Sequence, residues 1–147
     1  MDLGETVSGN DDGTATLAIG LGFRKRCTAD ALAALVGDAR ARLAARHPAL
    51  ADAPAVLATV SEKDRPALRD AAARLGLAVV ILPKEALLAH AGRVTVTSEA
   101  ARACLGVPSV AEAAALAAAR PGARLLVSRI ATAEATCAIA AVAPEAP

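Results

Sequence analysis

Short apolar runs alternate with stretches of helical spacing along the first half of this chain. Leu17–Gly22 is an apolar run typical of a buried strand. Thr28 is a plausible N-cap for a helix over Ala29–Arg46 that ends before Pro48. Further strands are expected at Val56–Val60 and Leu77–Leu82, and further helices at Pro66–Leu75 and Lys84–Ala91. This alternation predicts a parallel sheet with right-handed crossovers, and wholly apolar strands imply helices on both faces.

The second half adds a capped helix and a hairpin. Ser109 and Glu112 form a capping-box pattern before an apolar run that ends near Arg120. Leu125–Val127 and Thr136–Val142 indicate two strands joined by a loop of roughly seven residues. The intervening chain predicts a short strand or extended loop at Val94–Val96 and a helix at Ser98–Leu105. The predicted class is three-layer α/β/α with a mostly parallel sheet and a C-terminal antiparallel hairpin.

The length of 147 residues suits one domain. Met1–Thr14 is polar and Gly-rich and predicts a flexible tail, leaving residues 15–147 as a single α/β domain. The hydrophobic fraction of 55% comes mostly from alanine, and no window reaches the roughly 18 apolar residues of a membrane span. The N-terminus lacks a signal-peptide pattern. We therefore expect a cytoplasmic protein without membrane contact.

Charge and residue usage exclude several function classes. A net charge of +1, with one Phe and no Tyr or Trp, provides neither a basic field nor stacking platforms for nucleic acid. Cys27, Cys104 and Cys137 are scattered, as is typical of reduced thiols, and the two histidines stand alone. We expect neither a metal site nor a cofactor.

Basic residues follow the ends of successive predicted strands. They are Arg24, Lys25 and Arg26, then Lys63 and Arg65, then Lys84, and finally Arg129. The carboxyl ends of parallel strands share one edge, where ligands of open α/β sheets bind and where helix N-termini favour anions. The pattern predicts a ligand with several negative charges. Ordinary solvated loop charges explain the same spacing, and the sequence leaves both interpretations open.

Other candidate chemistries have simpler explanations. Gly20-x-Gly22 lacks the third glycine of a dinucleotide fingerprint, and the acidic residue after the second predicted strand, Glu62, is too distant, which favours close backbone packing. Cys27 stands beside three cations, a setting that lowers a thiol pKa, yet no nearby histidine offers a base, and space filling is the alternative. Glu112 could act as an acid or base, or simply complete the capping box. The residues alone do not establish an enzyme.

Four segments together carry a family resemblance. Ile19–Thr28 resembles the G-x-G-C-R-R-G-T stretch of the cobalamin-biosynthesis CobE family, the family of the CbiG C-terminal domain. Gly106–Leu116 is close to that family's G-x-x-S-V-A-E-A-A-A-L signature, the most specific of the matches. The remaining matches are Thr59–Asp64 and the terminal pair Leu125–Arg129 and Ala135–Ala140. The likeness runs in order from about Leu17 to Val142.

The resemblance implies a role in building the corrin ring of vitamin B12. Larger members open a ring-A δ-lactone on a cobalt-corrinoid and release a two-carbon fragment, but they carry further regions that this sequence does not contain. Phe23, Cys27 and Arg129 stand where the family often has Cys, Gly and Lys. A lysine-specific role at Arg129 therefore does not transfer, because a guanidinium is not a small ammonium. Whether this chain is an enzyme stays open.

Corrin precursors carry several acetate and propionate carboxylates, which a ring of cations at the sheet edge would suit. The resulting hypothesis is a corrinoid-intermediate site formed by Gly20, Gly22, Arg24, Lys25, Arg26, Lys63, Ser109 and Arg129. If lactone opening occurred here, water would be the nucleophile and Glu112 the one candidate base. The alternatives are a non-catalytic adaptor that hands intermediates to other corrin-pathway enzymes, and an unrelated phosphate- or nucleotide-binding module.

Overall fold

A five-stranded sheet runs through the centre of the computed structural model, which describes residues 17–90, 109–119 and 122–142. Its strands are β1 (Leu17–Phe23), β2 (Ala55–Val60), β3 (Ala78–Leu82), β4 (Arg124–Ala131) and β5 (Ala135–Ala141). The spatial order is β3-β2-β1-β5-β4, with β1, β2 and β3 parallel and β5 antiparallel to both of its neighbours. Strand β4 consequently runs in the direction of β1, and the carboxyl ends of β1 to β4 lie at one edge.

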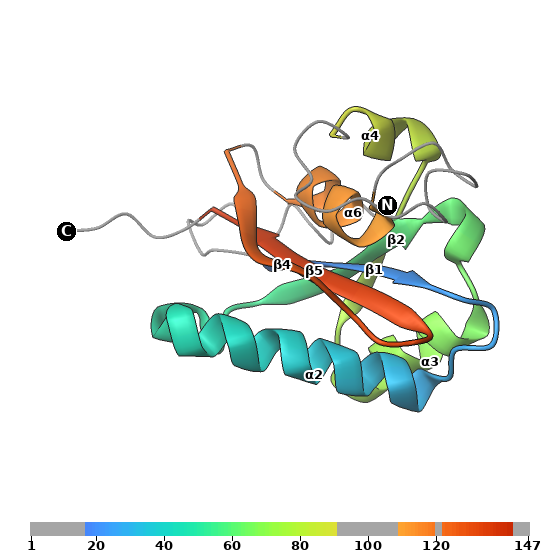
Figure 1. Ribbon diagram of the computed structural model, residues 1–147, viewed down its shortest axis with the longest axis horizontal. Helices are drawn as coiled ribbons and strands as arrows, with labels where there is room; N and C mark the ends of the chain where they lie inside the picture. Colours follow the sequence, from blue (N-terminus) through green and yellow to red (C-terminus); the bar gives the residue numbers. More distant parts are fainter. Residues whose placement is uncertain (1–16, 91–108, 120–121, 143–147) are drawn as a thin grey trace.

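Helices cover both faces of the sheet. They are α2 (Ala29–Arg46), α3 (Pro66–Leu75), α4 (Lys84–Leu88) and α6 (Val110–Ala118), with short 3-10 turns at η1 (Pro48–Leu50) and η2 (Ser61–Lys63). Figure 1 shows α2 and α3 beneath the sheet and α6 and α4 above it. The predicted three-layer α/β/α class, with its mostly parallel sheet and terminal antiparallel hairpin, is confirmed.

Local sequence signals fix the ends of the two longest helices. The Thr28 hydroxyl oxygen accepts a hydrogen bond from the Ala31 N–H at 3.1 Å and caps α2, which ends before Pro48. Pro66 occupies the first turn of α3, and Gly76 closes it with a φ of 69°. Both helices have the bounds that the sequence predicts.

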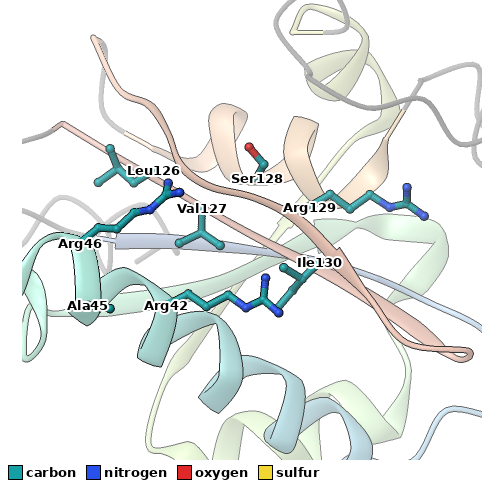
Figure 2. Close-up of a pocket in the computed structure, with 8 residues that line it drawn as sticks. All are labelled: Arg42, Ala45, Arg46, Leu126, Val127, Ser128, Arg129 and Ile130. Carbon is teal, nitrogen blue, oxygen red and sulfur yellow. The ribbon is translucent and has the colours of Figure 1, made fainter.

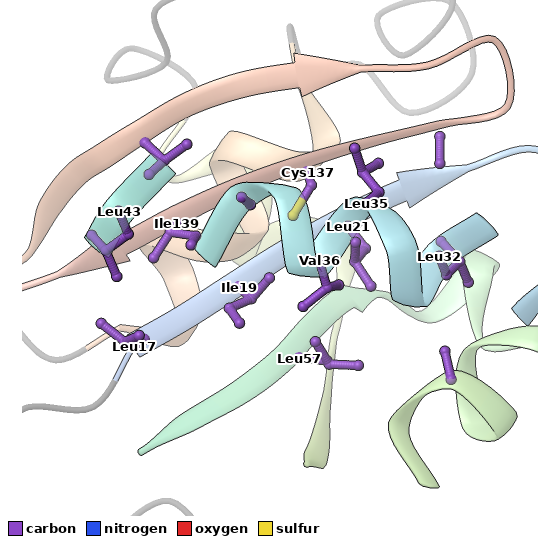
Figure 3. Packing of buried hydrophobic residues seen from close by; sticks show 14 of the residues in the cluster. Leu17, Ile19, Leu21, Leu32, Leu35, Val36, Leu43, Leu57, Cys137 and Ile139 are labelled. Atoms are coloured by element: carbon purple, nitrogen blue, oxygen red, sulfur yellow. The ribbon is translucent and has the colours of Figure 1, made fainter. Parts of the chain in front are cut away.

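The main core lies between β1, its neighbouring strands and α2. Leu17, Ile19 and Leu21 of β1 point toward α2, as Figure 3 shows, and all three are fully buried. Other members of this cluster are Leu32, Leu35, Val36 and Leu43 of α2, Leu57 of β2, and Cys137 and Ile139 of β5. Alternate residues of β1 therefore serve this core, and the intervening residues face α6.

Helix α6 lies so close to β1 that the helix backbone itself, and not a side chain, contacts the strand at Gly20. A Cβ added at Gly20 would overlap the backbone oxygen of Ala111 and lie 2.7 Å from the Ala115 nitrogen. A Cβ at Gly22 would lie 2.9 Å from the Thr136 hydroxyl and 3.3 Å from Val110. At Gly20 glycine is required because only hydrogen fits against the helix backbone, whereas the neighbours of Gly22 are side-chain atoms. The sequence favours close backbone packing at these glycines over a dinucleotide fingerprint, and this geometry agrees.

The terminal hairpin differs from the prediction in its length. Strand β4 continues to Ala131, so the connection is Thr132–Glu134 rather than a loop of roughly seven residues. The register shifts on either side of Val127, which marks irregularities in β4. These bulges break the alternation of apolar and polar positions, and Ser128 and Arg129 therefore resemble loop residues in the sequence.

Several predicted features lie outside the described residues: the tail Met1–Thr14, Val94–Val96, Ser98–Leu105 and Cys104. Across the described segments, no helix combines the length and the apolar character needed to cross a membrane.

The packing of α6 on β1 generates a stability prediction. Gly20→Ala should lower the free energy of unfolding by about 3 kcal/mol or more, because the added methyl collides with backbone that cannot rotate away. Gly37→Ala is the matched control, since nothing lies within 4 Å of a Cβ at that helical position. It should raise stability by about 0.5–1 kcal/mol. Urea unfolding followed by circular dichroism measures both, and a Gly20→Ala protein of unchanged stability would contradict the packing.

Candidate anion-binding site

Two cations are fixed to one backbone carbonyl at the end of β1. The Phe23 oxygen accepts hydrogen bonds from Lys63 Nζ at 2.9 Å and from Arg65 Nη1 at 3.2 Å. Turn η2 carries Lys63 into this position directly after β2, and Arg65 precedes the proline that begins α3. Arg65 Nη2 also donates a hydrogen bond to the backbone oxygen of Glu62 at 3.4 Å. We call Phe23, Lys63 and Arg65 the Phe23 cluster.

The ring of Phe23 reinforces this arrangement. Its centroid lies 6.0 Å from Lys63 Nζ and 5.5 Å from the Arg65 guanidinium carbon, distances at which a ring face attracts cations. The ring itself is buried, so it cannot stack on a ligand. Neither the carbonyl nor the ring carries a formal negative charge. The Phe23 carbonyl and ring therefore position two positive charges at the sheet edge without cancelling them.

A basic β-turn lies beside this cluster. The Cys27 N–H donates to the Arg24 oxygen at 3.0 Å, which places Lys25 and Arg26 at the tip of the turn. The Arg24 N–H donates a hydrogen bond to the backbone oxygen of Glu134 at 2.9 Å and so joins the turn to the β4–β5 hairpin. Arg26 Nε lies 3.3 Å from Glu134 Oε1, a charge contact without hydrogen-bond geometry. Arg24 and Lys25 are exposed and have no side-chain partner among the described residues.

The N-terminus of α6 faces the same edge. Val110 lies over Gly22 and Ala115 over Gly20, so α6 runs against the direction of β1 and begins at the carboxyl end of that strand. Ser109 is buried, and its hydroxyl accepts the Glu112 N–H at 3.3 Å as the N-cap. Gly20 itself is buried beneath α6, so a contact between its amide and a ligand is untested and stays a prediction.

Glu112 also makes a contact beyond the predicted capping box. Its N–H bonds to Ser109, but its fully buried carboxylate crosses to the sheet, where Oε2 accepts the Arg129 N–H at 2.8 Å. The Arg129 amide is available because the irregular stretch of β4 turns it out of the strand ladder. Glu112 therefore connects α6 to the edge strand, a role that the sequence pattern does not reveal.

Arg129 lies apart from the Phe23 cluster. The register places Ser128 and Arg129 opposite Ala138, which pairs with Gly20. That position is about 10 Å back along the strands from Phe23 and about 10 Å across two strand spacings. Arg129 lines a separate groove with Arg42 and Arg46. The structure thus gathers Arg24, Lys25, Arg26, Lys63, Ser109 and Gly22 at the sheet edge, whereas the backbone of Arg129 lies further back on β4. In Figure 2 the Arg129 side chain leaves β4 on the side away from Arg42 and Arg46, and its contact with a ligand at the edge stays a prediction.

The sequence places Arg65 among the basic residues after the second strand, but it does not reveal that Arg65 and Phe23 belong to one cluster. Phe23 departs from the family pattern and is the single Phe of a chain without Tyr or Trp. Arg65 follows Lys63 by two positions and shares its acceptor. A carbonyl acceptor on another strand leaves no trace in local sequence, so only the tertiary structure identifies these partners.

Both described cysteines are buried thiols. Burial raises the pKa of the Cys27 thiol above its usual value, and the negative charge of Glu134 raises it further. Burial also raises the pKa of Cys137 to about 12. The cations beside Cys27 in sequence do not activate it, which favours the space-filling interpretation. Among the described residues, no group of three His, Cys, Asp or Glu side chains could hold a metal ion.

Removal of the Glu112 carboxylate tests its structural role. Glu112→Ala should lower the free energy of unfolding by about 2–4 kcal/mol, because it leaves the Arg129 N–H without its acceptor and opens a void. Glu112→Gln should cost less, since an amide oxygen can still accept that bond. Denaturant unfolding provides the comparison. Equal losses in the two variants would show that the bond to Arg129 contributes nothing.

The raised thiol pKa values predict slow alkylation. At pH 8, iodoacetamide should modify Cys27 and Cys137 at least about tenfold more slowly in the folded protein than in guanidinium chloride, because thiolate is the reactive form. Peptide mapping by mass spectrometry reports each site separately. Rapid labelling of Cys27 in the folded protein would instead indicate an activated thiol.

Comparisons with known proteins agree with this fold. The family described as Cobalamin synthesis G C-terminus matches residues 17–140. The crystal structure of CobE, a protein from the cobalamin (vitamin B12) biosynthetic pathway, is 30% identical with a TM-score of 0.76, and the match covers 90% of this chain and 94% of that chain. Cobalamin biosynthesis protein chiG from Agrobacterium tumefaciens strain C58 is 39% identical with a TM-score of 0.60, covering 84% of this chain and 96% of that one.

Among curated proteins, none matches this chain. The family match nevertheless spans nearly all of the described sheet, and both crystal structures are similar over more than four fifths of the chain. These findings confirm the resemblance drawn from the sequence motifs. The chain belongs to the Cobalamin synthesis G C-terminus family and is a protein of cobalamin biosynthesis.

Proposed function

We propose that this protein binds a polycarboxylate corrin intermediate of cobalamin biosynthesis at the sheet edge formed by the Phe23 cluster and the 24–27 turn. The observation that carries the proposal is the double hydrogen bond from Lys63 and Arg65 to the Phe23 oxygen. It holds two cations in place with a neutral acceptor, so their charge is not cancelled by that partner. Preorganised cations bind carboxylates with less loss of side-chain freedom.

The neighbouring groups favour a ligand with several negative charges over one with a single charge. Arg24 and Lys25 add exposed cations from a different loop, and α6 begins at the same edge. The acetate and propionate arms of a corrin precursor radiate from one macrocycle and could reach several of these cations together. Lys63, Arg65 and the turn would each neutralise a different arm.

Binding without turnover suits the site better than lactone opening. Glu112 was the single base candidate, and it is fully buried with one oxygen accepting the Arg129 N–H. A general base has to reach the water that it activates. We therefore propose a carrier or adaptor that holds the intermediate for other pathway enzymes. Mixing the protein with the lactone intermediate alone tests this, because release of a two-carbon product would establish hydrolysis.

Calorimetric titration with cobyrinic acid, a corrin whose arms end in free carboxylates, tests the site. Lys63→Ala combined with Arg65→Ala should weaken binding about tenfold or more, because each lost charge-assisted bond contributes about 1.5–3 kcal/mol in favourable cases. Raising the salt concentration should weaken wild-type binding, since part of the attraction is screened. The full methyl ester of the same corrin, which keeps the ring and loses the charges, should not bind measurably.

Arg69→Ala combined with Arg74→Ala is the matched control. It removes the same charge from α3, where Arg69 pairs with Asp64 and Arg74 with Asp30. Affinity should stay within about twofold of wild type, because surface charges away from a site act weakly through solvent. If the two double variants lose affinity equally, the attraction is general electrostatics and the assignment of the site is wrong.

A further inference from the structure

The two edge strands of the sheet differ in how they are protected. Strand β4 carries the charged side chains of Arg124 and Arg129, the second of which leaves the strand in Figure 2, and its register shifts on either side of Val127. Such charges and bulges keep an edge strand from pairing with another chain. Strand β3, at the opposite edge, pairs with β2 without a shift and contains only Ala, Val, Ile and Leu. It therefore lacks both protections.

Strand β3 is open along its edge and not on its faces. Val79 and Ile81 pack against the core beneath the sheet, and Val80 and Leu82 pack against the smaller core that includes α6. All residues of β3 are nevertheless only half-buried, whereas the neighbouring β2 is buried from Val56 to Val60. The exposure of β3 thus comes from its unpaired side.

The hydrogen bonds of the sheet define which backbone groups of β3 face outward. The Leu17 N–H donates to the Pro54 oxygen at 2.8 Å, so alternate residues from Pro54 onward bond toward β1 and the intervening residues bond toward β3. Leu57 is one of the latter and lies opposite Val79. In a parallel pair, a bonding residue bonds to the two neighbours of the residue opposite it. The N–H and C=O groups of Val79, and by the same alternation those of Ile81, therefore point away from β2.

Backbone groups that point outward in series select an extended strand as their partner. In the described part of the chain, β3 has a strand on one side alone. We infer that two copies of this chain associate weakly through antiparallel pairing of their β3 strands about a two-fold axis at Val80. A two-fold interface uses the same patch on both copies, so the patch has to complement itself. This inference does not depend on the function proposed for the Phe23 cluster.

The side chains of β3 are self-complementary in this arrangement. Antiparallel pairing centred on Val80 sets Ala78 opposite Leu82 of the second copy and Val79 opposite Ile81. The smallest side chain thus meets one of the largest, and no like charges face each other. The outward groups of Val79 and Ile81 face one another as a hydrogen-bonded pair, and the two-fold axis repeats that pair.

The ends of the strand add charge complementarity. Continuing the register sets Lys84, the first residue of α4, opposite Gly76 of the second copy. Gly76 closes α3, and the carbonyl groups at a helix C-terminus favour a cation. Lys84 forms no ion pair with any of the described residues. The two-fold axis repeats this contact at the other end of the pair, which an unrelated strand would not provide.

The size of the interface predicts a weak dimer. Stable protein interfaces bury about 1,200–2,000 Å² in total, and two short strands with their flanks provide less. We expect a dissociation constant of roughly 10–100 µM, in the range of small transient interfaces. Because the paired strands are antiparallel, the Phe23 clusters of the two copies would lie at opposite ends of the joined sheet, and association would leave both accessible.

Sedimentation velocity of the full chain between about 5 and 500 µM tests the inference, because the average mass should rise from monomer toward dimer over this range. Val79→Pro removes an N–H that points away from β2, so it should weaken association at least about tenfold while the β2–β3 ladder remains. Ala78→Lys adds a charge to the edge and should have a similar effect. Ser128→Lys on β4 is the matched control and should leave the dissociation constant within about twofold of wild type. Circular dichroism shows that each variant is folded.

Cross-linking tests the register. Val80→Cys places the two new thiols opposite each other in a non-hydrogen-bonded pair, where Cα atoms about 4.5 Å apart permit a disulfide. Oxidation should link this variant into dimers at least about tenfold faster than wild type or Ser128→Cys.

Three results would overturn the inference. The first is a protein that stays monomeric over the whole concentration range. The second is a dimer that neither Val79→Pro nor Ala78→Lys weakens, because it would use another surface. The third is an equal loss of association in Ser128→Lys and Ala78→Lys, which would indicate general charge repulsion.

Discussion

The close contact between α6 and β1 is the constraint on which the rest of the structure depends. Because Gly20 has no side chain, the backbone of α6 at Ala111 and Ala115 rests on the strand itself. The apolar partners of β1 on its other face lie against α2, so the strand is enclosed from both sides. This enclosure fixes the direction of α6, and its N-terminus consequently faces the edge at which Phe23 holds Lys63 and Arg65.

The same contact positions the buried carboxylate of Glu112. With α6 held on β1, the buried Glu112 carboxylate reaches β4 and accepts the Arg129 N–H. That bond occupies an amide that the irregular strand leaves outside its ladder. The position of Arg129 is thereby tied to α6 rather than to the hairpin tip. Its side chain leaves β4 on the side away from α2 (Figure 2), and the Phe23 cluster is formed by Lys63 and Arg65 beside the 24–27 turn.

Features encoded by neighbouring residues were predictable, and those that depend on distant backbone were not. The Thr28 cap and the Pro66–Gly76 boundaries are local signals, so α2 and α3 have their expected limits. The gathering of cations at the carboxyl ends of β1 and β2 followed from parallel topology. In contrast, Arg129 lies within β4 because the strand continues past Val127 to Ala131, and the anchoring of Lys63 requires a carbonyl 40 positions away in the chain. Neither leaves a periodic trace in sequence.

Local contacts, and not the net charge of the chain, decide how much charge the Phe23 cluster presents. The formal charge of +1 is a sum over the molecule, whereas binding depends on local compensation. Asp30, Asp64 and Glu134 are each paired with an arginine, and Glu112 is buried against a backbone amide. The hydrogen bonds from Lys63 and Arg65 end on the uncharged Phe23 carbonyl, although Glu62 and Asp64 lie beside them in the chain. The charge that a ligand meets at this edge therefore depends on such local contacts and not on the net charge of the molecule.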